Sequence, residues 1–304
     1  MGATISPSRR PSVSVIVPFA GTPAGLGRLV DELTGLSRRE GDELIVADNR
    51  GRGSVSRAPR EAATPARETI RICAADGVRT PGFARNCAAR IATGEWLVFI
   101  DSDTRPSPQL LDAYFDPPPL PRTAILAGGI VDVTDRASLA ARHSLAREHM
   151  SQRATLARRG RPYAQTANCA VLRSAFNAVG GFSERIRAGE DADLCFRLAD
   201  AGWRLEERPR AGVEHRGRDS LGPLLVQLAR HGSGAAWLNR RYPGEFPAPR
   251  PLELVGRVAR TSRAASLALA RGELGSAVLA LLDLVTAGAF DLGRLLPNGA
   301  RARA

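Results

Sequence analysis

The sequence predicts an α/β fold in which a mostly parallel central sheet is covered by helices on both faces. Over the first 130 residues, short apolar runs alternate with segments of helical periodicity, and the runs are apolar at nearly every position. Strands of that kind belong to parallel sheets that are buried on both faces. From about residue 222 to the end the pattern is helical, which predicts a helical C-terminal extension.

The elements of the first half begin and end at recognisable signals. Thr22-Pro23 and Thr80-Pro81 each predict a helix start, because a threonine hydroxyl caps the first turn and proline fits the first helical position. The expected strands are 13–17, 43–47, 69–73, 96–100 and 124–127, and residues 50–67, rich in Gly, Arg, Ser and Pro, are expected to form a long loop.

The second half is less regular. An arginine-rich helical stretch is expected over 138–158, a helix is expected to start at Gly189, and a short strand is expected over 203–206, with His215 placed after a strand. The chain is therefore expected to divide into a disordered N-terminus (1–11), a core domain (12–219, with halves 12–130 and 131–219) and the helical extension (220–304).

Composition narrows the classes of partner. The formal net charge is +12 and the chain contains no Lys, so all 43 basic residues are Arg. This excess predicts attraction to the phosphates of nucleotides or anionic lipids. No basic run carries interleaved aromatic residues, so nucleic acid is not an expected partner. The four cysteines lack metal-site spacing and indicate reduced thiols in a cytoplasmic protein.

Acidic residues follow two of the predicted strands. Asp48 ends the strand over 43–47, and Asp101-Ser102-Asp103 directly follows the strand over 96–100. Because ligands of parallel sheets bind beyond the carboxyl ends of the strands, these side chains are expected in one crevice. Carboxylates suit Mg²⁺ or Mn²⁺, which can bridge phosphate oxygens. A solvated turn is the alternative interpretation for Asp101-Ser102-Asp103, and a turn formed with Asn49 is the alternative for Asp48.

Two further places could carry chemistry. Gly189-Glu190-Asp191 puts two carboxylates at a helix start, where one could accept a proton from an attacking hydroxyl or merely stabilise the helix dipole. His215 is either structural or a metal ligand that completes the site of Asp103. The other three histidines, His143, His149 and His231, are expected to have no special role.

These pieces, in order, resemble the family 2 glycosyltransferases. The segments that carry the resemblance are Val13 to Pro18, Glu43 to Asp48, Gly82-Phe83-Ala84-Arg85-Asn86, Gly94 to Asp103, Gly180-Gly181-Phe182 and Gly189-Glu190-Asp191-Ala192-Asp193-Leu194. Together they span about residues 12–216. Each motif alone is weak, whereas the ordered set is specific.

The resemblance implies a nucleotide-diphospho-sugar transferase fold of the GT-A type, with inversion at the anomeric carbon. It implies that Asp191 is the general base and that Glu190 orients the acceptor. Donor contacts would come from Pro18, Asp48, Arg85, Asp101 and Ser102, and the Mn²⁺ or Mg²⁺ ligands would be Asp103 and His215. The family often has Asp-Asp-Gly-Ser or Asp-Asn-Gly-Ser after the second strand. Here Asp48-Asn49 runs into Arg50-Gly51-Arg52-Gly53-Ser54, so the donor contacts other than Asp48 stay open.

The expected activity is therefore metal-dependent sugar transfer from a nucleotide diphosphate sugar, a UDP-sugar in preference, to an unidentified acceptor hydroxyl. A sugar nucleotidyltransferase is one alternative, although Phe19-Ala20-Gly21-Thr22 is a poor phosphate loop. A non-catalytic nucleotide- or carbohydrate-binding protein on the same fold is the other.

An apolar helical face marks the C-terminal extension. Its residues are Leu274, Val278, Leu281, Val285, Leu292 and Leu295. Such a face is expected to pack on the core or on a second copy in a homodimer. Peripheral contact with the inner face of a membrane is the alternative, in line with the arginine surplus. No run reaches the ~18 uninterrupted apolar residues of a spanning helix.

Overall fold

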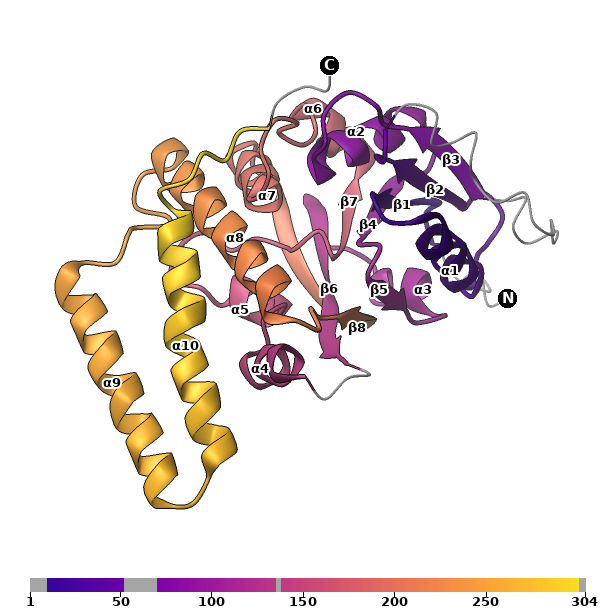
Figure 1. The fold of residues 1–304 in the computed structure, drawn as a ribbon. Helices are drawn as coiled ribbons and strands as arrows, with labels where there is room; N and C mark the ends of the chain where they lie inside the picture. The colour runs from indigo at the N-terminus through magenta and orange to yellow at the C-terminus, as the bar shows by residue number, and fades with distance from the viewer. Residues whose placement is uncertain (1–9, 52–69, 135–137, 301–304) are drawn as a thin grey trace, which may run out of the picture.

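The computed structural model describes residues 10–51, 70–134 and 138–300, in which strands and helices alternate along the chain (Figure 1). The strands are β1 (Val13–Phe19), β2 (Glu43–Asp48), β3 (Ile70–Ala74), β4 (Trp96–Ile100), β5 (Thr104–Pro106), β6 (Thr123–Val133), β7 (Asn168–Leu172) and β8 (Arg204–Arg216). The helices are α1 (Pro23–Thr34), α2 (Pro81–Ile91), α3 (Leu110–Tyr114), α4 (Leu139–Arg147), α5 (Gln152–Leu156), α6 (Arg173–Ala178), α7 (Glu190–Asp200), α8 (Leu221–Arg241), α9 (Pro251–Ala270) and α10 (Leu274–Gly293).

The described strands form one sheet in the order β3-β2-β1-β4-β7-β6-β8-β5. The neighbours β3, β2, β1 and β4 are parallel, as the sequence predicts, and β6 is parallel to β8. Strand β7 runs antiparallel between β4 and β6, and β5 runs antiparallel to β8. The sheet is therefore mixed, with its parallel part in the first half of the chain.

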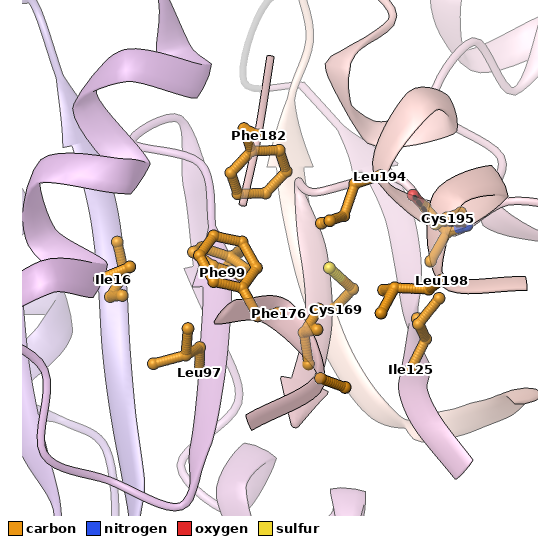
Figure 2. Close-up of a cluster of buried hydrophobic side chains, with 14 of the residues drawn as sticks. Ile16, Leu97, Phe99, Ile125, Cys169, Phe176, Phe182, Leu194, Cys195 and Leu198 are labelled. Carbon is orange, nitrogen blue, oxygen red and sulfur yellow. Dashed lines mark hydrogen bonds between the residues drawn. The ribbon is translucent and has the colours of Figure 1, made fainter. Parts of the chain in front are cut away.

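Apolar side chains fill both faces of this sheet. Alternate residues of β1 and β4 point to opposite sides, because side chains alternate along a strand. Ile16, Leu97 and Phe99 face a cluster under α2, α6 and α7, part of which Figure 2 shows. Val98 and Ile100 face a second cluster under α1 and α3. Strand β4 is thus buried along its whole length, and its chain emerges from the core at Asp101.

Both predicted helix starts are confirmed. Thr22 accepts a hydrogen bond from the Gly25 N–H at 3.2 Å, and Thr80 accepts one from the Phe83 N–H at 3.2 Å. Each cap is followed by proline at the first helical position. The caps fix where α1 and α2 begin, and therefore which side chains of α2 reach the end of the sheet.

The strand expected over 203–206 is much longer than predicted. Strand β8 continues to Arg216 because a shift in its pairing with β6, between Gly128 and Gly129, accommodates the residues around Pro209. A proline and glycines normally end a strand, whereas here the irregularity absorbs them. As a result His215 lies within a strand, not after one.

Two segments named by the sequence reach outside the described residues. Of the N-terminal segment over 1–11, residues 1–9 are not described, whereas Arg10 pairs with Asp42 at 2.5 Å and with Asp112 at 2.6 Å. Of the loop over 50–67, only residues 50 and 51 are described. The boundaries after residues 130 and 219 stay predictions, and β6 runs across the first of them.

The C-terminal extension is helical, as predicted. Helix α10 lies between α8 and α9, and α9 and α10 form a hairpin that extends away from the sheet (Figure 1). The apolar face of the extension does not pack on the core, because Leu274, Val278, Leu281, Val285, Leu292 and Leu295 are 36–81% exposed. That part of the prediction is wrong, since α10 turns its small residues inward instead, Ala277 and Ala280 among them.

Candidate active site

A cleft of about 550 Å³ opens at the carboxyl ends of the parallel strands. Its walls come from the ends of β1 and β4, from the start of α7 and from α8. Seven of the nine residues singled out from the sequence line it: Pro18, Arg85, Asp101, Ser102, Asp103, Glu190 and Asp191. The fold thus brings together residues that are up to 173 positions apart, as expected for a ligand site of an α/β sheet.

Arg85 connects the two acidic pairs of the cleft. Its guanidinium is 2% exposed and lies 2.6 Å from Asp101 Oδ1 and 2.9 Å from Glu190 Oε1. Burial opposes the charged form, but the charges of Asp101 and Glu190 outweigh it and raise the pKa of Arg85. Within the described residues its Nε has no hydrogen-bond partner. A buried cation between two carboxylates fixes the strand end against the helix start.

Close backbone approach brings α2 and α7 to this position. A Cβ on Gly82 would lie 2.9 Å from the Ser183 carbonyl, so α2 packs directly on the chain that leads to α7. Gly189 has a φ of +88°, and a Cβ there would lie 2.9 Å from Leu238 Cδ1. Only glycine satisfies both the conformation and the contact with α8 at this helix start. These two glycines therefore let α2 and α8 approach the start of α7 closely.

The carboxylates of α7 have unusual acidities. Burial, together with the neighbouring charge of Glu190, raises the pKa of Asp191 to about 7, although the Ala192 N–H and Arg85 act in the opposite direction. Burial also raises the pKa of Glu190, while Arg85 opposes the shift. Asp191 accepts a hydrogen bond from the Ala192 N–H at 2.8 Å. Its carboxylate can therefore exchange a proton near neutral pH.

His215 joins the strand end from the opposite side. It is paired with Thr104 of β5 and with Asp132 of β6, because β8 lies between those strands. Its Nδ1 lies 2.8 Å from Asp132 Oδ1, and its Nε2 lies 3.8 Å from Asp103 Oδ1. Burial lowers the pKa of His215, but the Asp132 hydrogen bond and the charge of Asp103 raise it overall. Asp132 thus orients the ring so that Nε2 points toward Asp103.

The residues that could hold a cation are therefore Asp103 and His215. Burial and the charge of Asp101 raise the pKa of Asp103, whose Oδ2 lies 3.5 Å from Arg218 Nη2. Among the described residues no group of three or more His, Cys, Asp or Glu side chains is placed to bind a metal. A carboxylate and an imidazole still suit Mn²⁺ or Mg²⁺ when a ligand supplies further oxygens.

Asp48 lies at the end of β2 but does not line the cleft. It is fully buried, and its carboxylate accepts hydrogen bonds from Arg50 Nε at 2.9 Å and Nη2 at 2.7 Å. Asn49, the next residue, does line the cleft. The role of Asp48 as a nucleotide contact stays a prediction. A ligand that binds Asp48 would have to share its carboxylate with Arg50.

The sequence did not single out the basic wall of the cleft. This wall is formed by Arg187, Arg218 and Arg230. Among the described residues, Arg187 and Arg230 have no ion-pair partner. With 43 arginines in the chain, no local pattern marks these three as special. Their nearness to Glu190 or His215 along the chain could have marked Arg187 and Arg218, but not Arg230 on α8.

Sequence comparison finds relatives over most of the chain. A profile of the family described as Glycosyltransferase like family 2 matches residues 11–234. The pre-mycofactocin glycosyltransferase of Mycobacterium tuberculosis, in strains CDC 1551 and H37Rv, is 30% identical over 296 residues, which are 93% of this chain and 60% of that protein. The chain therefore spans about 60% of the length of these curated relatives. The N-acetylglucosaminyl-diphospho-decaprenol L-rhamnosyltransferase of M. tuberculosis CDC 1551 is 41% identical over 95 residues, 30% of this chain and 31% of that protein.

Solved structures show the same fold. The mannosyltransferase PcManGT from Pyrobaculum calidifontis, in complex with GDP-Man and Mn²⁺, matches with a TM-score of 0.62 and 18% identity over 97% of this chain and 90% of that chain. GalNAc-T7 with UDP, GalNAc and Mn²⁺ matches with a TM-score of 0.52 and 13% identity, over 74% of this chain and 48% of that chain. These similarities confirm the GT-A fold that the resemblance implied.

Proposed function

Because the chain belongs to the glycosyltransferase-like family 2, we propose that it transfers a hexosyl group from a nucleotide diphosphate sugar to an acceptor hydroxyl, with inversion. One observation carries the proposal. Arg85 binds one carboxylate of each acidic pair, Asp101 and Glu190, and leaves the other carboxylate of each pair, Asp103 and Asp191, without an arginine within 3 Å among the described residues. One of these two carboxylates, Asp191, has a pKa of about 7, and the other, Asp103, faces His215. Such a pair suits a displacement reaction that removes a proton from the acceptor and releases a diphosphate.

Asp191 is the general base of this mechanism. The acceptor hydroxyl attacks the anomeric carbon from the face opposite the diphosphate, and Asp191 takes the hydroxyl proton as the new bond forms. A pKa of about 7 suits that task, because a base works best when its pKa lies near the operating pH. Glu190, fixed on Arg85, holds the first turn of α7 and orients the acceptor.

Asp103 and His215 are the proposed protein ligands of Mn²⁺ or Mg²⁺. Asp103 fits this role because Arg85 lies on Asp101 instead, so the nearest basic groups to Asp103 are Arg218 at 3.5 Å and His215 at 3.8 Å. When bound, such a cation would neutralise charge on the leaving diphosphate. The arginines of the basic wall, Arg187, Arg218 and Arg230, supply further positive charge to the same phosphates.

The donor is bound along the ends of β1, β2 and β4. Pro18 and Ser102 line the cleft there, and Asp48 is the proposed contact to the base or ribose. We favour a UDP-sugar. The structures of the fold relatives hold GDP-Man in one case and UDP in the other. We place the enzyme in the cytoplasm, in line with its four unpaired cysteines.

Thermal unfolding with a panel of nucleoside diphosphates, each with and without Mn²⁺, tests the donor and metal site. We expect one nucleotide to raise the midpoint only when Mn²⁺ is present, because binding to the folded state stabilises it. The matched variants are Asp103→Asn, which should lose the metal-dependent part of the shift, and the exposed Asp200→Asn, which should keep it. An equal shift in Asp103→Asn and in the unaltered protein would contradict the metal assignment.

A further inference from the structure

The C-terminal hairpin carries an apolar surface that no described residue covers. The residues Leu274, Val278, Leu281, Val285 and Leu292 follow one another at helical spacing along α10 and are 36–67% exposed; they are called the α10 stripe below. Among the described residues, α10 is the helix that is both long enough and apolar enough to cross a bilayer. Only 22% of its 18-residue apolar window is buried within the protein. On α9, Leu252, Val255 and Val258 add further exposed apolar area. An exposed apolar helix face of this length usually marks an interaction site.

The opposite side of α10 is fixed to the catalytic body. Asp283 lies 2.8 Å from His143 Nε2 and 2.6 Å from Arg147 Nη2, both on α4. Gly232 of α8 and the backbone at Phe290 of α10 are packed so closely that a Cβ on Gly232 would collide with the Phe290 carbonyl. Because α10 is tied to α4 by these ion pairs and packs closely on α8, it is not free to cross a bilayer in this arrangement. It can lie in the plane of a membrane surface with the α10 stripe outward.

Free positive charge accompanies the stripe. Arg260 and Arg263 on α9 and Arg271 at the turn of the hairpin have no ion-pair partner among the described residues, whereas Arg257 is paired with Asp291 at 2.6 Å. The acidic residues of α10, Asp283 and Asp291, are both neutralised within the protein. Glu253 at the start of α9 and Glu273 near Arg271 are the other acidic residues of the hairpin. The middle of α9 therefore presents Arg260 and Arg263 without an acidic partner among the described residues, and apolar side chains together with such arginines bind anionic lipid surfaces.

We propose that the α10 stripe and the free arginines of α9 form a docking surface for an anionic lipid bilayer, with α10 lying in the headgroup plane. A second copy of the chain is the less suitable occupant, because a two-fold contact brings the same surface of both copies together and would place like charges side by side. Lipid phosphates instead neutralise Arg260, Arg263 and Arg271.

The docking surface adjoins the cleft. Phe290 lines the cleft wall, and Leu292, Leu295 and Leu296, all more than half exposed, follow it directly. A bilayer against the α10 stripe would thus meet the chain close to the cleft entrance. If the proposed transferase activity holds, docking brings the cleft within reach of an acceptor carried on a lipid.

Vesicle flotation of the full chain tests the proposal. The probes are vesicles of phosphatidylcholine alone and of phosphatidylcholine mixed with phosphatidylglycerol. We expect flotation with the mixed vesicles only, reduced by salt because surface charges are screened. Val278→Gln, Leu281→Gln and Val285→Gln together should weaken binding by about tenfold or more, since each buried apolar group contributes separately. The matched control, Leu120→Gln with Val131→Gln, removes equally exposed apolar residues of the catalytic body and should float normally.

A second variant keeps the test independent of the stripe. Arg260→Gln, Arg263→Gln and Arg271→Gln together should lose about tenfold or more at low salt, since each basic residue near the surface adds to binding. Unchanged flotation of both the stripe variant and the arginine variant, or no flotation of the unaltered protein, would overturn the proposal. So would a dimer in solution that the stripe variant converts to a monomer without any vesicle binding. Asp191→Asn should float like the unaltered protein, so failure of the proposed chemistry would be seen separately.

Discussion

The strand end at Asp101–Asp103 and the helix start at Glu190–Asp191 each bring two carboxylates into the cleft, yet their surroundings differ. At the strand end the carboxylate not bound by Arg85 is Asp103, whose pKa is raised by burial and by Asp101 but is held down by His215 at 3.8 Å and Arg218 at 3.5 Å. At the helix start the corresponding carboxylate, Asp191, has a like charge as its immediate neighbour, and its pKa rises to about 7.

This difference supports the different chemistry that we propose for two similar motifs. A carboxylate that faces an oriented imidazole is suited to hold a cation, whereas a buried carboxylate that faces no imidazole among the described residues and has a pKa of about 7 is suited to exchange a proton. Arg85 makes the distinction possible, because it neutralises Asp101 and Glu190 and so leaves one carboxylate of each pair for chemistry. Changing each group in turn can break or sharpen the comparison.

The largest effect is expected at Asp191. Asp191→Asn keeps the size of the side chain and the acceptor for the Ala192 N–H, but it removes the base. We expect the rate of sugar transfer, to the acceptor or to water, to fall about 10³-fold, as measured by the release of nucleoside diphosphate. The affinity for the donor should be unchanged. Steady-state kinetics and calorimetric titration of the donor measure the two quantities.

The control lies on the same helix. Asp200→Asn changes an exposed carboxylate of α7 that pairs with Arg161 at the surface, and it should leave the rate unaltered. A loss of donor affinity as large as the loss of rate in Asp191→Asn would remove Asp191 from the role of base and return it to donor binding.

Much of this cleft could be predicted from the sequence, for a definite reason. Strands β1, β2 and β4 are apolar on both faces, so each ends visibly where polar residues begin, and Asp101 and Asp103 stand at such an end. The glycine at position 189 indicated the helix start in the sequence. The structure gives the reason for a glycine there, since its φ is +88° and Leu238 lies close to its Cα.

The second effect concerns stability and tests whether Arg85 holds both acidic pairs. Arg85→Met leaves the buried Glu190 and the half-buried Asp101 without their cation, and we expect the free energy of unfolding to fall by about 3–5 kcal/mol at neutral pH. Without Arg85 the pKa of Glu190 in the folded protein rises further above its unfolded value. Stability then falls as pH increases across that interval, so the loss should be smaller at about pH 5 than at about pH 8.

Denaturant unfolding at the two pH values measures this loss. The matched variant is Arg90→Met on the same helix, whose exposed guanidinium lies 3.5 Å from Glu184. We expect it to change stability by at most about 1 kcal/mol, as exposed ion pairs do. Equal losses in the two variants would mean that Arg85 contributes no more than a surface arginine.

What the sequence did not predict depends on pairing between distant segments. Asp132 orients His215 because β6 and β8 are neighbours, and nothing local to either residue indicates that pairing across 83 positions. The same holds for Arg230, which reaches the cleft only because α8 packs against Ala188 and Gly189. The sequence marked the α10 stripe but left open whether the core, a second copy or a membrane covers it, because an amphipathic pattern does not specify what covers its apolar face.

A smaller effect is expected when the orientation of His215 is disturbed. Asp132→Asn removes the carboxylate that lies 2.8 Å from Nδ1, and we expect Mn²⁺ affinity in the presence of nucleoside diphosphate to fall about 10- to 100-fold. Calorimetric titration with Mn²⁺ measures it. Asp116→Asn, an exposed carboxylate 3.5 Å from Arg210, serves as the control. Unchanged Mn²⁺ affinity in Asp132→Asn would indicate that His215 does not act as a ligand.

The smallest effect is the pH dependence of the unaltered enzyme. Burial raises the pKa of Asp191 to about 7, chiefly with the charge of Glu190 and against Arg85, while Asp101 and Tyr163 also interact with its charge. Other ionisable residues that line the cleft are Asp103, His149, Arg187, Arg218, Arg230 and His231. A base must be deprotonated, so kcat/KM should fall about tenfold for each pH unit below about 7 and level off above it.

The residual activity of Asp191→Asn identifies the group responsible. Asparagine does not titrate, so the inflection near pH 7 should disappear from the variant, while an inflection due to any other group would persist. A profile that keeps the same inflection without Asp191 would show that Asp191 is not the proton acceptor. It would also end the contrast between the two acidic pairs, because the helix start would then bind substrate as the strand end does.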